Sequence, residues 1–281
     1  MSVLKIIGEK INGTRRHVAQ AIEQRDAAVI RDLAVRQAEA GAAWLDVNAG
    51  TRSSAEPEDL VWLIKTIQPV VEIPLCLDSA NPVAVAAGMQ VVERTPMINS
   101  ISGESQRLEG LLPLVSEHGC TVIALAMDGS GIPATCERRL DVARRLMAET
   151  RARGVPDDHV YLDPLAMTLA TKSDGAQITL DTIGALRQEF PEAHLTLGLS
   201  NISFGLPARS YINRAFLTLA LAAGLDSAIL DPLDREMMAG LMAAELVLGR
   251  DHHCLSYTRA YRAGLFAGPE RADPSTTSRG S

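Results

Sequence analysis

Carboxylate and amide side chains stand at or near the ends of short apolar runs throughout this sequence of 281 residues. Each such group donates or accepts several hydrogen bonds, so several of them brought together would bind the polar edge of a small molecule. One group alone also has a structural use, because Asp and Asn cap helices and begin turns. The residues in question are Glu9, Asn12, Asp46, Asn48, Asp78, Asn81, Asn99, Asp128, Asp163, Asn201 and Asp231.

Eight apolar runs accompany these polar residues and are interpreted as the strands of a parallel sheet. The runs are hydrophobic without clean alternation, which is typical of strands covered on both faces. Their starts lie 22 to 40 residues apart, which leaves room for a helix between successive parallel strands. The predicted strands are Leu4–Gly8, Trp44–Val47, Leu75–Leu77, Met97–Ile101, Val122–Ala126, Val160–Leu162, Leu195–Leu199 and Ser227–Leu230.

The segments between the runs carry helix signals. Val18–Ala40 is rich in Ala, Gln, Glu and Arg, and Gly41 is of the type favoured just after a helix. In other segments, Pro early in a helix and Ser or Asn before it are typical start signals. Further helices are expected to open at Ser54–Pro57, with Ser54 or a neighbour as the cap, and at Asn81-Pro82, and to span Pro133–Arg153 and Arg209–Gly224.

Eight β–α units with no break in composition favour one α/β architecture. They predict a single (β/α)8 TIM barrel rather than an open doubly wound sheet. The barrel domain is expected over residues 1–267. Residues 268–281 are polar and contain Pro and Gly, which predicts a disordered tail.

Charge and hydropathy limit the classes of partner. The net charge of −7 argues against nucleic acid, because phosphate binding needs clustered Lys and Arg. Mixed-sign clusters such as Glu137-Arg138-Arg139 are typical of solvated helix faces. The start lacks the long apolar stretch of a secretory signal, and the longest apolar run, Ala215–Leu225, is too short to span a bilayer. We therefore expect a cytoplasmic protein with no membrane partner.

The C-terminal ends of the strands form the active face of a TIM barrel, so the polar groups at those ends would converge on one mouth. Capping accounts for Asp231 and Asn81, but it does not require Asn99 or Asn201 inside the mouth. No His lies at a strand end, so a protein-bound metal is not expected. A flat heterocycle with alternating donors and acceptors fits better, and a pterin has such an edge.

Seven short segments support a more specific interpretation, because they all occur in the same order as in a known family. On these segments the sequence resembles the methyltetrahydrofolate:corrinoid-protein methyltransferases, over about residues 3 to 265. That family shares a pterin-binding barrel with the folate module of cobalamin-dependent methionine synthase and with dihydropteroate synthase. The segments are GEKINGT (8–14), LDVNAG (45–50), LCLDSANP (75–82), INSIS (98–102), MDGSGIP (127–133), LDPL (162–165) and GLSNISFGLP (198–207).

The resemblance implies a substrate, a partner and a set of site residues. The substrate is tetrahydrofolate or 5-methyltetrahydrofolate, and the methyl carrier is a corrinoid (cobalamin) held by a separate corrinoid protein. The chain itself is implied to form a homodimer. The resemblance further implies that Asp78, Asn99 and Asp163 hydrogen-bond the pterin edge, that Asn201 reaches the pterin N5, and that Arg209 and Glu9 give supporting contacts.

The chemistry explains an amide at the seventh strand end. The methyl group of 5-methyltetrahydrofolate sits on a tertiary amine, so its transfer to Co(I) requires the charge developing on N5 to be relieved. A lysine beside N5 would oppose protonation, whereas Asn201 donates or accepts as N5 changes state, through water to Asp163. We therefore predict Asn201 and Asp163 as the catalytic residues. The alternative is that Asn201 only caps the following turn.

Other functions stay open beside methyl transfer. Dihydropteroate synthase chemistry must neutralise a leaving diphosphate, and its pattern has a lysine after strand seven and an arginine after strand eight. This sequence has Ser200-Asn201 and Asp231-Pro232 there. A non-catalytic module that binds a pterin or a corrinoid protein is a further alternative. The residues leave open the direction of transfer, either into acetyl-CoA synthesis or from demethylation of a methoxy compound or methylamine. They also leave open a tetrahydromethanopterin-type carrier.

Overall fold

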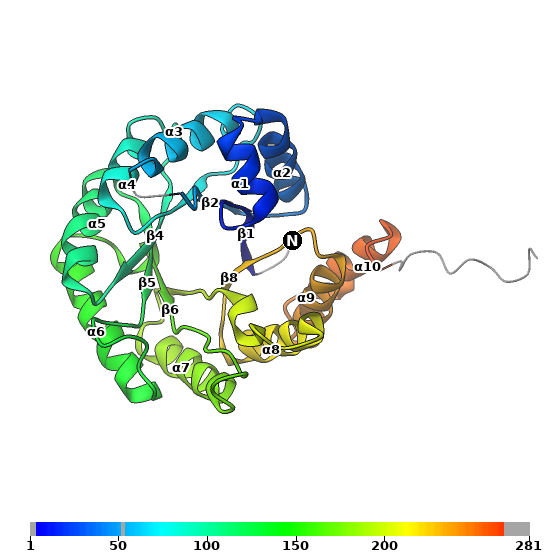
Figure 1. Ribbon diagram of the computed structural model, residues 1–281. Coiled ribbons are helices and arrows are strands. Elements are labelled where there is room, and N and C mark those ends of the chain that lie inside the picture. Colours follow the sequence, from blue (N-terminus) through cyan, green and yellow to red (C-terminus); the bar gives the residue numbers. More distant parts are fainter. Residues whose placement is uncertain (1–3, 52–53, 267–281) are drawn as a thin grey trace, which may run out of the picture.

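The strands of this chain form a ring, and the α-helices lie outside it (Figure 1). The computed structural model describes residues 4–51 and 54–266, so the predicted tail 268–281 lies outside the described residues. Eight parallel strands follow the order β7-β6-β5-β4-β3-β2-β1-β8, and a bridge between Gly198 and Ile229 joins β7 to β8. The predicted (β/α)8 barrel is confirmed. The strands are β1 (Lys5–Asn12), β2 (Trp44–Asn48), β3 (Leu75–Asp78), β4 (Met97–Ser102), β5 (Thr121–Leu125), β6 (Val160–Asp163), β7 (His194–Leu195) and β8 (Ser227–Leu230).

The helices alternate with the strands along the chain. They are α1 (Arg16–Glu23), α2 (Ala27–Glu39), α3 (Glu56–Ile67), α4 (Pro82–Met89), α5 (Ser105–His118), α6 (Cys136–Ala152), α7 (Gly175–Glu189), α8 (Arg209–Ala223), α9 (Arg235–Val247) and α10 (Leu255–Arg262). Short 3-10 helices are η1 (Asp157–His159), η2 (Leu199–Ser203) and η3 (His252–Cys254). Over residues 4–51 and 54–266, no helix is both long enough and apolar enough to cross a membrane.

The prediction of one helix over Val18–Ala40 is wrong, because the chain breaks between α1 and α2. Arg25 adopts a left-handed backbone with φ 54°. Asp26 then accepts hydrogen bonds from two backbone N–H groups of α2, at 3.1 and 3.4 Å. A capping carboxylate satisfies donors that the first turn of a helix leaves free, so a second helix starts there. Gly41 follows α2 with φ 95°, as its position predicts.

The other helix starts are close to the predictions. Asn81 accepts a hydrogen bond from the Val83 N–H at 3.1 Å and caps α4, as expected. Pro57 lies in the first turn of α3, and the cap position falls on a neighbour of Ser54, as the prediction allowed. The residue before α3 is Ala55, which offers no side-chain cap. Pro57 has no backbone N–H to satisfy in the first turn and its φ suits a helix, so α3 starts without a side-chain cap.

The seventh strand is shorter than the predicted Leu195–Leu199, because only His194–Leu195 is a strand. After it the chain still hydrogen-bonds both neighbours, since the Thr196 N–H donates to Leu162 O and the Ile229 N–H donates to Leu197 O, each at 2.9 Å. It then turns into η2. Ser and Asn favour turns over strands, so η2 carries Asn201 in a tight 3-10 turn at the mouth.

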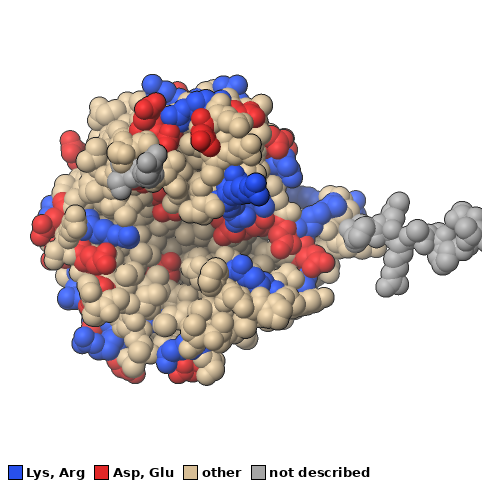
Figure 2. Space-filling view, viewed as in Figure 1, with Lys and Arg blue, Asp and Glu red and all other residues tan. Residues whose placement is uncertain are grey.

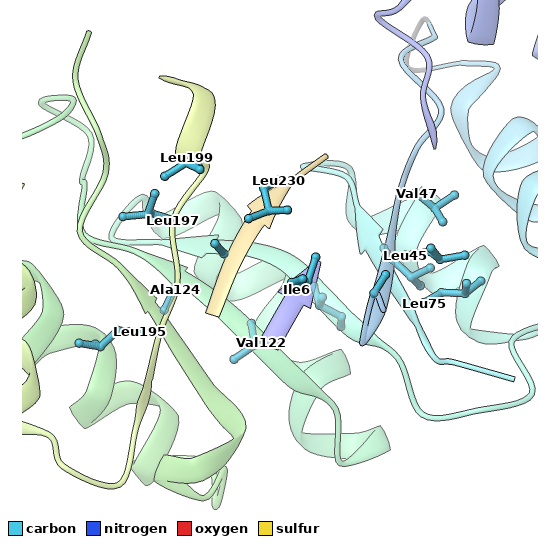
Figure 3. Packing of buried hydrophobic residues seen from close by; sticks show 14 of the residues in the cluster. Ile6, Leu45, Val47, Leu75, Val122, Ala124, Leu195, Leu197, Leu199 and Leu230 are labelled. Atoms are coloured by element: carbon cyan, nitrogen blue, oxygen red, sulfur yellow. The ribbon is translucent and has the colours of Figure 1, made fainter. Parts of the chain in front are cut away.

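Alternate strand residues pack in opposite directions. One set fills the layer between strands and helices, as Ile6, Leu45, Leu75 and Val122 do (Figure 3). A second, separate cluster fills the barrel and contains Ile7, Cys76, Met97, Ile123 and Tyr161. Successive side chains on a strand point to opposite faces. The residue two positions after each member of the barrel cluster therefore also faces the barrel axis.

Candidate active site

Three predicted site residues continue the rows of the barrel cluster toward the C-terminal mouth. Asp78 lies two positions after Cys76, Asn99 two after Met97, and Asp163 two after Tyr161. Asp78 and Asn99 are also direct neighbours across β3 and β4. The strand geometry thus places the three side chains inside the ring. In the space-filling view the centre of the barrel is hollowed, and acidic side chains are exposed within the hollow (Figure 2).

Asp46 joins this group, although the sequence did not single it out as a site residue. The Asn99 Nδ2 donates to Asp46 Oδ1 at 3.1 Å, and the neighbouring Asn48 Nδ2 donates to Asp78 Oδ2 at 2.8 Å. Each amide is therefore held by a carboxyl group of another strand. Because Asn99 uses its N–H toward Asp46, its carbonyl oxygen is the group left to accept from a ligand. The signal in the sequence was the Asp46/Asn48 alternation in LDVNAG.

Two acids in this group sit close together with little to neutralise them. Burial, and then the charge of Asp78, raise the pKa of Asp46 well above its ordinary value. Burial also raises the pKa of Asp78, against hydrogen bonds from Asn48 and Asp46 and the charge of Arg107. Two buried carboxyls in contact keep a proton between them. Asp46 is the more deeply buried, which favours the shared proton on Asp46 and the charge on Asp78.

Asp163 is buried at the end of β6. Its Oδ1 accepts a hydrogen bond from the Leu165 N–H at 2.7 Å. Burial raises the pKa of Asp163 to about 7, although hydrogen bonds from the Leu165 and Gly198 N–H groups and the charge of Arg139 oppose the rise. A carboxyl group with that pKa gains or loses a proton near neutral pH, which suits proton exchange with a bound ligand.

Asn201 lies beside the same backbone segment that contacts Asp163. A Cβ atom added to Gly198 would lie 2.8 Å from the Asn201 Nδ2, so glycine lets this amide lie close to the backbone. Asn201 accepts from the Phe204 N–H with its backbone oxygen at 3.2 Å, and its side chain bonds no other described residue. The side chain therefore does not cap the turn and is exposed to a ligand. Gly198 brings the two predicted catalytic groups together.

Glu9 and Arg209 line a neighbouring cavity of about 300 Å³ between β1, η2 and α8. Glu9 pairs with Arg15 at 2.8 Å, and burial still raises the pKa of its carboxyl group. Arg209 donates to Ser200 O at 2.6 Å and to Ser203 Oγ at 3.0 Å. The guanidinium thus braces η2 from outside, next to Asn201. The six predicted site residues fall into a barrel-interior group and this adjoining cavity.

The remaining strand-end residues serve turns. The residues whose side chains accept local backbone hydrogen bonds are Asn12, Asn81, Asp128 and Asp231. Asp231 also pairs with Lys10 at 2.7 Å, in addition to the predicted capping role. In the part of the chain that the structure describes, no three His, Cys, Asp or Glu side chains are grouped so that they could hold a metal ion.

Comparison with known proteins gives the class of this barrel. The family described as "Pterin binding enzyme" matches residues 8–231, and the chain belongs to that family. Among named relatives, the methylcorrinoid:tetrahydrofolate methyltransferase of Eubacterium limosum is 40% identical over 269 residues, which cover 95% of this chain and 99% of the relative. The methionine synthase of Mycobacterium leprae is 34% identical over 238 residues. This match covers 80% of the chain but 20% of that longer protein.

Solved structures agree on the fold. A dihydropteroate synthase of Coxiella burnetii in complex with pteroic acid superposes with a TM-score of 0.68 at 14% identity. A Xanthomonas albilineans dihydropteroate synthase with 4-aminobenzoic acid gives 0.66 at 20% identity. Each match covers 88% of this chain and 94% of the other. At these identities the likeness concerns the barrel and not the reaction.

Proposed function

We propose that this protein transfers a methyl group between N5 of tetrahydrofolate and the cobalt of a corrinoid carried by a partner protein. The relative from Eubacterium limosum, matched along nearly its full length, supports this reaction. The observation that carries the proposal in the structure is the Asn201 side chain, which bonds no other described residue. It lies against Gly198, whose N–H bonds Asp163, and the carboxyl group of Asp163 has a pKa of about 7. The pair offers N5 a neutral hydrogen-bonding group and a nearby proton store.

The residues divide the binding task by their hydrogen-bonding capacity. The Asp78 and Asp163 carboxylates accept from the amino and ring N–H groups of the pterin, and the Asn99 carbonyl oxygen accepts from a further N–H. Asp46 fixes the Asn99 amide in that orientation through the 3.1 Å bond. Glu9 and Arg209, on the adjoining cavity, support the part of the substrate beyond the ring.

Asn201 acts on the reacting nitrogen. In transfer from methyltetrahydrofolate, the C–N bond breaks, N5 keeps the electron pair and gains a proton, and the methyl group goes to the cobalt that the partner supplies. Asn201 donates to N5 as that pair develops, and Asp163 supplies the proton through water. In the reverse direction the same groups accept the proton. A side chain without fixed charge serves both states of N5.

The proposal is tested with free cobalamin, which needs no partner protein. Purified protein is mixed anaerobically with 5-methyltetrahydrofolate and cob(I)alamin, and the corrinoid spectrum is followed. We expect conversion to methylcob(III)alamin at a rate proportional to enzyme. Tight pterin binding without transfer would replace the proposal by the non-catalytic binding module. Formation of dihydropteroate from p-aminobenzoate and pterin pyrophosphate, without methyl transfer, would replace it by the synthase.

The physiological direction that we propose runs from methylcorrinoid to tetrahydrofolate, after the order of substrates in the relative's name. The methyl group would then come from an upstream demethylation, such as O-demethylation of a methoxy compound by another protein. Progress curves started from each side, with the cognate corrinoid protein, measure both rates. A negligible rate of transfer from methylcorrinoid to tetrahydrofolate under cellular substrate ratios would contradict this direction.

We further propose that residues 1–267 form one domain, that the chain is a homodimer, and that it resides in the cytoplasm. The dimer follows from the resemblance to the methyltransferases, and large apolar side chains exposed on α8, Tyr211 and Leu219, are consistent with a covered surface. Light scattering of the purified protein should give twice the 30.1 kDa chain mass. A monomeric mass at micromolar concentration would contradict the dimer.

A further inference from the structure

Arg139 on α6 is a fully buried cation behind the active site, with 0% of its surface exposed. The expectation that Glu137-Arg138-Arg139 forms a solvated helix face is therefore wrong for its last residue. Buried cations are ordinarily paired with a carboxylate. Arg139 bonds to backbone oxygens and one hydroxyl instead, and it has no ion pair with any Asp or Glu of the described residues.

The guanidinium ties three segments of the mouth together. Its Nε donates to Pro133 O, in the loop after β5, at 3.0 Å. Its Nη1 donates to Pro164 O and Leu165 O, in the loop after β6, each at 2.8 Å, and to Thr179 Oγ1 of α7 at 3.3 Å. A planar fork of fixed donors suits several acceptors at set angles. Such a clamp fixes the loop that follows β6.

That loop has a conformation that needs support. Leu165 adopts a left-handed backbone with φ 65°, which is unfavourable for any residue with a Cβ atom. The conformation aims the Leu165 N–H at Asp163 Oδ1, 2.7 Å away. The Leu165 oxygen that Arg139 holds belongs to the same residue as this N–H. The cation therefore acts on Asp163 through one strained residue.

We propose that Arg139 is a positioning residue for methyl transfer, which holds the Pro164–Leu165 turn so that Asp163 keeps its place and its hydrogen bond in the pterin site. This inference rests on the proposed role of Asp163. The groups that act on the Asp163 carboxyl are burial, the two N–H groups of Leu165 and Gly198, and the charge of Arg139. On the α6 side, the other titratable neighbour of Arg139 is Cys136. Loss of Arg139 removes a cation and loosens one N–H, and both changes raise the pKa of Asp163.

The test compares Arg139→Met with Arg138→Met, since the two arginines are adjacent on α6. Arg138 is 70% exposed on its side chain and lies 3.8 Å from Asp141, so it offers the same change without contact to the loop. The pH dependence of kcat/KM for 5-methyltetrahydrofolate is measured with cob(I)alamin. The limb due to Asp163 is identified as the one that Asp163→Asn abolishes. We expect Arg139→Met to move this limb to higher pH by about one unit, and Arg138→Met to leave it in place.

A second variant separates charge from geometry and guards against a failure of Arg139→Met to fold. Arg139→Lys keeps the cation, but its ammonium lacks the planar fork of donors that holds Pro133 and Leu165 at set angles. It should lower kcat severalfold while moving the limb by less than Arg139→Met does. In an Asp163→Asn background, Arg139→Lys should lower kcat/KM by less than about twofold, because the group it positions is gone.

The outcomes separate this inference from the proposed function. Two results would overturn the role of Arg139 alone. In the first, Asp163→Asn abolishes the limb of the pH profile, but folded Arg139→Met does not move it. In the second, Arg139→Lys keeps the wild-type kcat and the wild-type pH profile. Undiminished transfer in Asp163→Asn, with an unchanged pH profile, would overturn the role of Asp163 and remove the basis of the inference.

Discussion

The two ends of the barrel interior both hold polar groups, but they treat charge in opposite ways. At the N-terminal end, Lys5 Nζ donates to Tyr161 OH and to His194 Nε2, each at 3.1 Å. The Nδ1–H of His194 then donates to Asp226 Oδ2 at 2.9 Å. Arg187 pairs with the same carboxylate at 2.9 Å. Every charged group of this cluster has a hydrogen-bond partner, and Asp226 also has a cation beside it.

The pKa values show the consequence. Burial alone would raise the pKa of Asp226, yet hydrogen bonds from His194 and Leu195 and the charge of Arg187 hold it below its ordinary value. At the C-terminal mouth, burial raises the pKa values of Asp46, Asp78 and Asp163 without enough partners to offset it. At the N-terminal end charged partners stabilise the acid, whereas the mouth keeps acids with raised pKa values, which is typical of functional sites.

Substitution of Asn201 should have the largest effect, and it tests whether the C-terminal mouth is the functional end of the barrel. Asn201→Ala removes the group that acts on N5 only as charge develops, so kcat should fall by about 10²–10³ while the pterin Kd changes by less than about threefold. Stopped-flow transfer to cob(I)alamin and equilibrium pterin binding measure the two effects. Asn12→Ala is the matched control, because Asn12 is a strand-end amide that holds Thr14 in a turn. Unimpaired transfer in Asn201→Ala would contradict its role.

The raised pKa of Asp163 should be visible in stability as well as in catalysis. A carboxyl group with a folded pKa of about 7 stabilises the fold below its unfolded pKa, and this contribution is lost as the pH rises through 7. Asp163→Asn has no such loss, so between about pH 4 and pH 8 it should gain about 2–4 kcal/mol on the wild type. Urea unfolding at several pH values measures the gain.

Asp128 is the control of opposite sign for that experiment. Hydrogen bonds from Ser130 and the charge of Arg145 lower its pKa. A group with a lowered pKa stabilises the fold above its unfolded pKa and loses that contribution as the pH falls. Asp128→Asn should therefore lose stability relative to the wild type as the pH rises from the lowered pKa to the ordinary value of 3.8, and should change little between about pH 4 and pH 8. A parallel response of the two variants would contradict the assignment of charge at the mouth.

The N-terminal cluster should respond in stability and not in catalysis. Asp226→Ala leaves Arg187 and His194 without their shared carboxylate, which should cost about 2–3 kcal/mol at pH 7. The kcat for methyl transfer should remain within about twofold of wild type, since the cluster lies at the other end of the barrel. Asp141→Ala, which breaks a surface pair with Arg144 at 3.1 Å, should cost less than about 1 kcal/mol. A large loss of kcat in Asp226→Ala would end the functional contrast between the two ends.

The smallest expected effect is on pterin binding, and it tests whether Asp46 at the mouth is protonated. If Asp46 holds a proton, Asp46→Asn replaces an O–H donor by an N–H donor of similar shape, and pterin Kd should change by less than about threefold. Asp46→Ala frees the Asn99 amide and should weaken pterin binding by about tenfold. Isothermal titration with a pterin measures both variants. Equal losses in the two would indicate that Asp46 is ionised.

Most of the barrel could be read from the sequence, because its strands are buried on both faces and end in polar residues. Asp78 and Asp163 were predictable since each follows an apolar run directly, whereas Asn99 lies inside the run Met97–Ile101 and was indicated by the resemblance. Asp46 was grouped with the strand-end residues but was not predicted as a site residue, because the resemblance assigned it no contact. Only the tertiary structure shows that the Asp46 carboxyl group accepts a hydrogen bond from the Asn99 side chain.

Arg139 escaped prediction for a different reason. Its neighbours Glu137 and Arg138 are charged, and local charge pattern is typical of a solvent-facing turn of helix. Only the docking of α6 against the loop after β6 distinguishes Arg139 from Arg138. The break between α1 and α2 is similar, since the left-handed Arg25 carries no signal of its own in the sequence. The local sequence pattern predicted the helices and strands, whereas tertiary contacts determined the burial of Arg139 and the break at Arg25.

The joint between β7 and β8 has a consequence for motion. Seven neighbouring pairs of strands form hydrogen-bonded ladders, whereas this pair closes through the bridge at Gly198 and Ile229. Local opening is easiest where backbone hydrogen bonds are fewest. Amide hydrogens from Leu197 to Asn201 should therefore exchange faster than those of the other strand ends, and slow when a pterin binds. The rate of amide hydrogen exchange at the joint between β7 and β8 would then report whether a pterin occupies the site.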